Sequence, residues 1–214
     1  ALDTIRDWTA RGHHVLIDSG VFNLANDHAK RNRLSLEEAL TLAPEQIDGY
    51  DELFAAYCRI AAALKDDCWG YVEIDQGGRE NKTKTRARLE ALGLNPIPVY
   101  HPVSDDWDYF DELATNYDRI CVGNVVQADT EFRNRLIAEI WQRRRYYPDL
   151  WIHLLGYTPN AILNAFPVNS CDSSTWLSAV RWPDAFIVRS ALQPVSRLDT
   201  RFAYDYATDF RAPG

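Results

Sequence analysis

The sequence contains no methionine and has only four cysteines, ten glycines and ten prolines among its 214 residues. The cysteines are far apart and form no Cys-x-x-Cys pair, which argues against a zinc knuckle and indicates reduced thiols in a cytoplasmic protein; they are Cys58, Cys68, Cys121 and Cys171. Because no methionine stands at position 1, we expect the sequence to start after the initiator residue, with an N-terminal portion missing.

Long apolar runs are also absent. No stretch approaches the roughly 18 to 20 uninterrupted apolar residues of a membrane span, and the N-terminus lacks the basic and apolar regions of a secretory signal. We therefore expect a soluble, cytoplasmic protein with no membrane partner. Lys and Arg number 23 against 31 Asp and Glu, so the net charge of -8 disfavours indiscriminate nucleic-acid binding but allows a local basic face.

What the sequence does contain is an alternation of short apolar runs with longer segments of helical period. This pattern is typical of βα units that form a parallel sheet. Strands are expected at 14–18, 71–75, 97–101, 120–123, 151–156 and 168–172, with a weaker one at 185–188. Helices are expected after a capping box at Ser35 and Glu38, over 47–64, over 80–92 with Gly93 closing it, over 129–146, and from Thr158-Pro159.

Nearly every expected strand ends in residues that could do chemistry. These residues are Asp18 with Ser19 and Gly20, Asp75 with Gln76, His101, Gly123 with Asn124, His153 with Gly156, and Asp172 with Ser173. In a closed parallel barrel all strand ends converge on one rim, whereas an open doubly wound sheet forms a site only at its switch point. No Gly-x-Gly-x-x-Gly or P-loop motif supports the open alternative. The prediction is one (β/α)8 TIM-type barrel over residues 1–214, with strand ends at 18, 75, 101, 123, 156 and 172 and a C-terminal extension from about 183 to 214.

Each of these polar residues also has a structural interpretation. Asp18 and Asp75 can serve as turn residues, and Asp172 can cap a following helix. His101 and His153 can be satisfied structural groups. A metal-dependent hydrolase is the second hypothesis, because carboxylate and imidazole ligands suit Zn, Mn or Fe, although no His-x-His or His-Glu-x-x-His spacing is present.

Five stretches together resemble the strand ends of the tRNA-guanine transglycosylase superfamily. In order along residues 13 to about 180, they are Leu16-Ile-Asp-Ser-Gly-Val-Phe22, Val72-Glu-Ile-Asp75, Ile120-Cys-Val-Gly-Asn124, Ile152-His-Leu-Leu-Gly-Tyr-Thr-Pro159 and Val168-Asn-Ser-Cys-Asp172. Two further stretches, 95–101 and 172–176, look most similar to the short phage and bacterial branch. Members of that branch exchange guanine in DNA for a 7-deazaguanine such as preQ0.

The resemblance implies a TIM barrel without a cofactor or a metal, in which Asp172 is the nucleophile. Asp18 is the candidate for moving the proton between the leaving and entering bases. Asp75 would recognise the donors of a guanine-like base, and the backbone near Gly123 and Asn124 would face its O6. The remaining substrate-binding candidates are Ser19, Gly20, Phe22, His101, His153 and Gly156, with Tyr157 as an alternative to Phe22 for stacking on the base.

Three departures from the family qualify these expectations. The structural-zinc insertion with its Cys-x-Cys-x-x-Cys spacing is absent, which favours DNA or a free nucleoside over tRNA. Only about a dozen residues precede the strand at Asp18, so the barrel is either N-terminally incomplete or closed with help from 186–210. His101-Pro102 replaces the family's Gln-Gly.

The phosphates of a nucleic acid would need cations. The candidates are Arg79, Lys82, Lys84, Arg86, Arg88, Arg133, Arg135, Arg143, Arg144 and Arg145, unless these residues form only solvated helix faces. A third hypothesis is a non-catalytic base- or DNA-binding subunit that needs a partner to complete the barrel.

Overall fold

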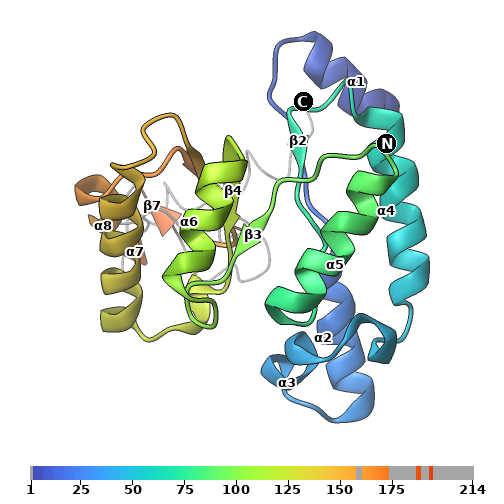
Figure 1. The fold of residues 1–214 in the computed structure, drawn as a ribbon, viewed down its shortest axis with the longest axis horizontal. Coiled ribbons are helices and arrows are strands. Elements are labelled where there is room, and N and C mark those ends of the chain that lie inside the picture. The colour runs from blue at the N-terminus through green and yellow to red at the C-terminus, as the bar shows by residue number, and fades with distance from the viewer. Residues whose placement is uncertain (1, 158–160, 174–186, 189–192, 195–214) are drawn as a thin grey trace. The chain divides into compact units, whose positions relative to one another are not determined.

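The computed structural model describes residues 2–157, 161–173, 187–188 and 193–194, and the chain forms two compact units. Unit 1 consists of residues 1–100 and 104–121, and unit 2 consists of residues 101–103 and 122–214. Both contain helices and parallel strands, so the α/β class predicted from the sequence is confirmed (Figure 1).

Unit 1 alternates helices and strands. Its elements are α1 (Leu2–Ala10), β1 (Leu16–Ile17), α2 (Val21–Asn32), α3 (Leu36–Thr41), the 3-10 helix η1 (Pro44–Gln46), α4 (Tyr50–Leu64), β2 (Gly70–Tyr71), α5 (Gly78–Ala91), β3 (Val99–Tyr100), α6 (Trp107–Asn116) and the first three residues of β4 (Arg119–Val122). Strands β1 and β2 are parallel, Val72 forms a parallel bridge with Ile97, and β3 lies beside β4. Each strand of unit 1 therefore neighbours the next one along the chain.

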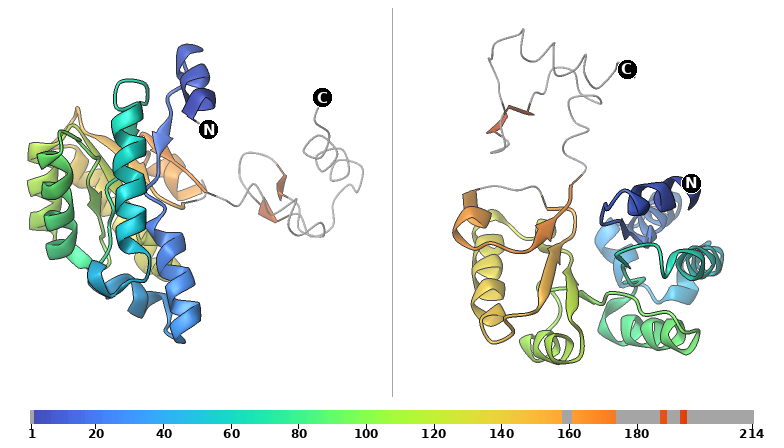
Figure 2. Two further views of the ribbon diagram at one scale, coloured as in Figure 1. Left: turned by 90° about the vertical axis from the view of Figure 1, so that its right-hand side faces the viewer. Right: turned by 90° about the horizontal axis from the view of Figure 1, so that it is seen from above.

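Unit 2 continues the same alternation. Its elements are the 3-10 helix η2 (Val125–Gln127), α7 (Thr130–Arg144), β5 (Trp151–Leu154), α8 (Ala161–Ala165), β6 (Ser170–Cys171), β7 (Ile187–Val188) and β8 (Gln193–Pro194). The Leu155 N–H donates to the carbonyl of Val122, which ends β4, and β5 pairs with β6 in parallel. Helix α8 lies next to α7 (Figure 2). β7 and β8 form an antiparallel pair.

Each of the seven expected strand segments overlaps an observed strand. β2 and β4 begin one residue earlier than expected, and every one of these strands except β4 is shorter than its expected segment. The helices expected at 80–92 and 129–146 are confirmed as α5 and α7, and Asp129 caps α7 by accepting a hydrogen bond from the Phe132 N–H at 2.9 Å. The capping box is also confirmed, because Ser35 Oγ accepts from the Glu38 N–H and Glu38 Oε2 accepts from the Ser35 N–H. Thr158-Pro159 and the C-terminal extension lie outside the described residues.

The single helix expected over 47–64 is wrong at its start. Ile47 follows η1, and α4 begins only at Tyr50, after Gly49 in a left-handed conformation with φ 85°. A left-handed residue interrupts a right-handed helix. The apolar spacing that predicted one helix therefore continues across a break at Gly49. Helices α1, α2 and α6 were not anticipated.

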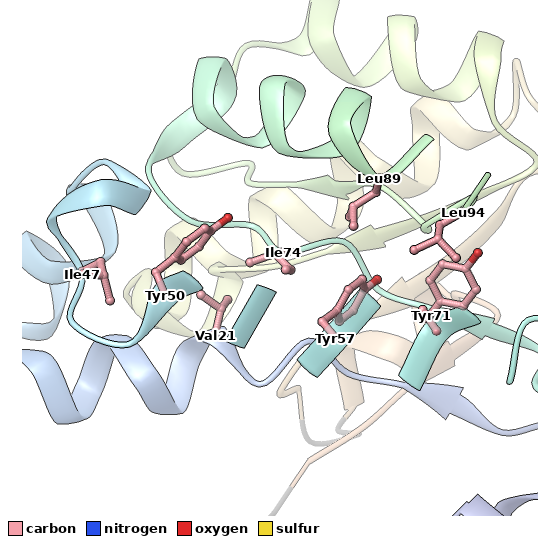
Figure 3. Close-up of a cluster of buried hydrophobic side chains, with 9 residues drawn as sticks. Val21, Ile47, Tyr50, Tyr57, Tyr71, Ile74, Leu89 and Leu94 are labelled. Carbon is pink, nitrogen blue, oxygen red and sulfur yellow. The ribbon is translucent and has the colours of Figure 1, made fainter. Parts of the chain in front are cut away.

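The main buried cluster of unit 1 gathers side chains from α2, α4, α5 and the strand region around β2 (Figure 3). Tyrosines supply much of it, and their hydroxyls are satisfied. Tyr57 Oη donates to the carbonyl of Val72 at 2.6 Å, and Tyr71 Oη accepts from the N–H of Asn95 at 2.6 Å. A buried tyrosine needs such partners, so these bonds tie α4 and the chain after α5 to the β2 region.

Two buried ion pairs hold α5 within unit 1. The Arg86 guanidinium lies 2.9 Å from Glu73 Oε2, and Lys82 Nζ lies 2.6 Å from Asp105 Oδ2. Glu73 Oε1 also accepts from the N–H of Val99 at 2.7 Å, so both of its oxygens have donors. Burial raises the pKa of Glu73, and the neighbouring Arg86 guanidinium opposes that rise. Glu73 and Arg86 therefore depend on each other for charge compensation.

The start of α5 contains two glycines, the cap residue Gly77 and the first helical residue Gly78, that differ in the space around them. Gly77 has φ 80°, and a Cβ there would lie 2.7 Å from the carbonyl oxygen of Leu42; Gly78 has φ 76° but open space around it. We expect Gly77→Ala to lower the free energy of unfolding by about 2 to 4 kcal/mol. The left-handed backbone costs an alanine about 1 to 2 kcal/mol, and the clash of its Cβ with the Leu42 carbonyl oxygen adds to that cost. Gly78→Ala, the matched control, carries the strain alone. Urea unfolding of both variants measures the difference, and equal losses would contradict the close approach.

Candidate active site

Strands β5 and β6 place four polar side chains on one face of the unit 2 sheet. Side chains alternate along a strand, so Trp151 and His153 share a face of β5, and Ser170 and Asp172 share a face at the end of β6. The register sets His153 opposite Ser170. His153 hydrogen-bonds both Ser170 and Asp172, so all four side chains lie on the same side of the sheet.

His153 is the centre of this group. Its Nδ1 lies 2.7 Å from Ser170 Oγ, and its Nε2 lies 3.1 Å from Asp172 Oδ1. The Trp151 indole N–H donates to Ser170 Oγ at 3.2 Å, and the Gly156 backbone N–H donates to Asp172 Oδ1 at 3.0 Å. The arrangement is therefore a connected chain from Trp151 to Asp172, with its acidic end at the carboxyl end of β6.

These bonds favour an ionised Asp172. The hydrogen bond from His153 lowers the pKa of Asp172 most, burial opposes it, and the Gly156 N–H lowers it further. Both hydrogen bonds from other described residues go to Oδ1. Oδ2 accepts no hydrogen bond from another residue in the described part of the chain.

The group resembles a Ser-His-Asp arrangement in its connectivity, and exposure decides which end would react. The Asp172 side chain is 60% exposed, whereas that of His153 is 9% exposed. In a serine nucleophile arrangement the carboxylate is buried behind the histidine. Here the carboxylate is at the open end and Ser170 Oγ is held from behind by Trp151, which favours Asp172 as the reacting group.

Unit 2 also contains the other predicted site residues from 101 onward. Asn124 has a left-handed backbone with φ 50°, and its Oδ1 accepts from the Val103 N–H at 3.3 Å. Gly123 is buried at the end of β4, and His101 is partly buried. The structure brings both His153 and Gly156 into hydrogen-bond contact with Asp172.

Unit 1 contains the predicted residues before position 100. Asp18 Oδ1 accepts from the Ser19 N–H at 2.7 Å, and Gly20 is the left-handed cap before α2, so Asp18 caps a backbone amide where the chain leaves β1. Phe22 is 52% exposed on α2, and Asp75 is partly buried beyond β2. The capping of a backbone amide by Asp18 is thus observed, while its proposed proton transfer stays a prediction.

Sequence reasoning missed Trp151 and Ser170 as members of the site. The signal was present: each lies two residues before a predicted site residue on the same strand, which puts it on the same face. Gln76, which the sequence places beside Asp75 at a strand end, is buried, and its Nε2 donates to the carbonyls of Ala39 and Leu42, so it secures the end of α3.

Two of the basic residues of α5 are not available to a phosphate, contrary to the expectation for them. Lys82 and Arg86 are buried in the ion pairs described above. Arg79 contacts Asp106 and Glu112, and Lys84 contacts Glu80. The sequence showed the positive charges but not the carboxylates that fold against them.

Two arginines of α7 bind backbone carbonyls of unit 2. Arg133 donates to the carbonyls of Val125, Val126 and Ala128 and so caps η2. Arg144 donates to the carbonyl of Pro167, just before β6 begins. Asp172 lies where β6 ends, whereas Pro167 lies before β6 begins. Residues 143–145 therefore flank the amino ends of the strands in unit 2, opposite to Asp172.

The same end of α7 borders a surface hollow of about 610 Å³. It is lined by Glu139, Trp141, Gln142, Arg143, Arg145 and Tyr146. The Trp141 ring packs edge-on against Phe166, and the Arg145 guanidinium lies 5.9 Å from the Trp141 ring centre. Phe166 also precedes β6, so this hollow lies near the amino ends of the strands, away from Asp172.

Within the described ranges, no three His, Cys, Asp or Glu side chains cluster in a way that could hold a metal ion. Nothing in that part of the chain favours the metal-dependent hydrolase. None of the described helices is long and apolar enough to cross a membrane. No protein-family model, no curated protein and no solved structure matches this chain.

Proposed function

We propose that the protein is a transglycosylase that exchanges guanine for a 7-deazaguanine base, such as preQ0, in DNA. The observation that carries this proposal is the Asp172 carboxylate at the end of β6, fixed through Oδ1 by His153 and Gly156 with Oδ2 left for a substrate. An ionised, oriented carboxylate is what attack at a sugar carbon requires. The resemblance of the strand-end motifs to the transglycosylase superfamily names the reaction.

The reaction would proceed in two displacements. In the first, Asp172 Oδ2 forms a bond to C1′, the bond from C1′ to N9 of guanine breaks, and its electron pair leaves on the base, which takes up a proton. In the second, N9 of the incoming base attacks C1′ and releases the carboxylate. Asp18 is the proposed group that gives and receives the proton, and Asp75 is the proposed partner of the donor edge of the base.

The finer fold prediction, a (β/α)8 barrel, belongs to this proposal. In each unit every parallel strand neighbours the next one along the chain. A barrel requires that order, whereas a doubly wound sheet reverses direction at a switch point. The consecutive order therefore supports the barrel as the architecture that carries the strand-end residues.

DNA as the partner is supported by the missing zinc insertion and opposed by the net charge of -8. With Lys82 and Arg86 buried, phosphate contacts would fall to fewer cations than the sequence offers. Binding should then be weak and reduced by salt. A duplex hides C1′, so the enzyme would act on a flipped-out nucleotide or a single strand.

The proposal is tested by incubating the protein with DNA and radiolabelled preQ0. We expect label in the DNA and an equal release of guanine. Single-stranded and duplex DNA, tRNA and free deoxyguanosine are offered in parallel to identify the substrate. Absence of label in all four would refute the base exchange and leave the non-catalytic subunit as the remaining hypothesis for this site.

A further inference from the structure

The hydrogen bonds around His153 define where its protons lie. An ionised Asp172 can only accept, so His153 Nε2 must carry the proton that points to Oδ1. Ser170 Oγ already accepts from the Trp151 N–H, and its own proton can go to His153 Nδ1 at 2.7 Å. Neutral His153 is therefore held as the Nε2–H tautomer by Ser170 and Trp151.

We propose that His153 is a positioning residue that stabilises the Asp172 carboxylate as it leaves the sugar in the second displacement. This proposal rests on the proposed function and assigns a role that the strand-end motifs did not give to His153. The geometry supplies two donors to one oxygen, Nε2–H of His153 and the backbone N–H of Gly156. Such paired donors stabilise negative charge that develops on an oxygen.

The effect should differ between the two displacements. During the first, Asp172 loses its charge as Oδ2 bonds to C1′, so a donor to Oδ1 gives no help with that step. During the second, the C1′–Oδ2 bond breaks, its electron pair returns to the carboxylate, and the N9 proton of the incoming base passes to the general base assigned to Asp18. Charge then grows on both carboxylate oxygens, and the bond from His153 to Oδ1 strengthens.

Among the described residues of unit 2, His153 on β5 is the titratable side chain that bonds Asp172. Cys171, the neighbour of Asp172 on β6, points to the opposite face of the strand by alternation. Gly156, in the segment after β5, offers only its backbone. His153 is therefore the residue whose replacement should change the behaviour of Asp172 most directly.

The test measures the covalent enzyme–DNA adduct on denaturing gels. With His153→Leu, we expect the adduct to accumulate when preQ0 is added, because its resolution slows about 10- to 100-fold. His153→Gln, which keeps a donor near the position of Nε2, should recover most of the rate. Ser170→Ala should give a smaller slowing in the same step, and Cys171→Ser on the other face is the matched control. Adduct resolution at the wild-type rate in His153→Leu would overturn the proposal.

A carboxyl NMR titration of Asp172 separates this inference from the proposed function. In His153→Leu the pKa of Asp172 should rise toward its ordinary value, whether or not the protein exchanges bases. An unchanged pKa would refute the role of His153 even if the wild-type enzyme is active. An inactive wild type would refute the base exchange while the titration still decides whether His153 controls this carboxylate. Should His153→Leu fail to fold, Ser170→Ala replaces it in both measurements.

Discussion

Replacing Asp172 by asparagine is expected to reduce base exchange by about 10⁴-fold or more, because an amide cannot form the glycosyl ester. Asparagine keeps nearly the same shape and can still accept from His153 and from the Gly156 N–H, which both bond Oδ1 in the native chain. The loss should therefore be in the chemical step and not in folding. Incorporation of labelled preQ0 into DNA measures the rate, and denaturing gels should show no enzyme–DNA adduct.

Asp149→Asn is the matched control for this variant. Asp149 is exposed in the segment between α7 and β5, just before β5 begins. The Asp149→Asn substitution removes the same charge without touching the site, so the rate of this variant should stay within about twofold of wild type. Full activity of Asp172→Asn would show that another group attacks the sugar. Equal losses in both variants would point to a general effect of charge instead.

Replacing Glu73 by glutamine is expected to lower the free energy of unfolding by about 3 to 5 kcal/mol, since it leaves the Arg86 charge buried without a carboxylate. The two side chains are 0% and 5% exposed, so water cannot replace the lost partner. Arg86 also donates to Tyr109 Oη at 3.2 Å, but a hydroxyl does not compensate a full charge. Urea unfolding at neutral pH measures the loss.

Two further variants distinguish the buried pair from charge in general. Glu73→Gln combined with Arg86→Met removes both charges and leaves a side-chain oxygen for the Val99 N–H, so most of the stability should return. Glu80→Gln removes an exposed carboxylate that contacts Lys84, and we expect a change of less than about 0.5 kcal/mol. If the double variant is as unstable as Glu73→Gln alone, the pair is not the source of the loss.

The sequence predicted the α/β class because its signals are local. Apolar runs such as Ile120 to Val122 become buried strands, and the reciprocal bonds of Ser35 and Glu38 involve residues only three apart. Helix α2 was missed for a local reason too. Its buried face is made partly of Ala25 and Ala29, which give a weak apolar pattern.

The sequence predicted part of the candidate site, because it locates the ends of the strands and the polar residues there. Asp172, His153 and Gly156 were all chosen from the sequence, and in the structure both His153 and Gly156 hydrogen-bond Asp172. The sequence could not indicate that both donors select Oδ1. That choice depends on the register of β5 against β6, which is set by pairing between segments 17 residues apart.

By itself the sequence determined where most of the strands and several of the helices form, and which strand ends carry carboxylates and imidazoles, because these properties depend on neighbours along the chain. Only the tertiary structure decided which charges are available. Lys82 and Arg86 read as a basic surface in the sequence, yet they are buried against Asp105 and Glu73, which come from other elements. The lack of methionine and the few cysteines excluded little by comparison. Burial and pairing across the fold, which no local pattern encodes, made Asp172 the exposed end of a hydrogen-bonded chain.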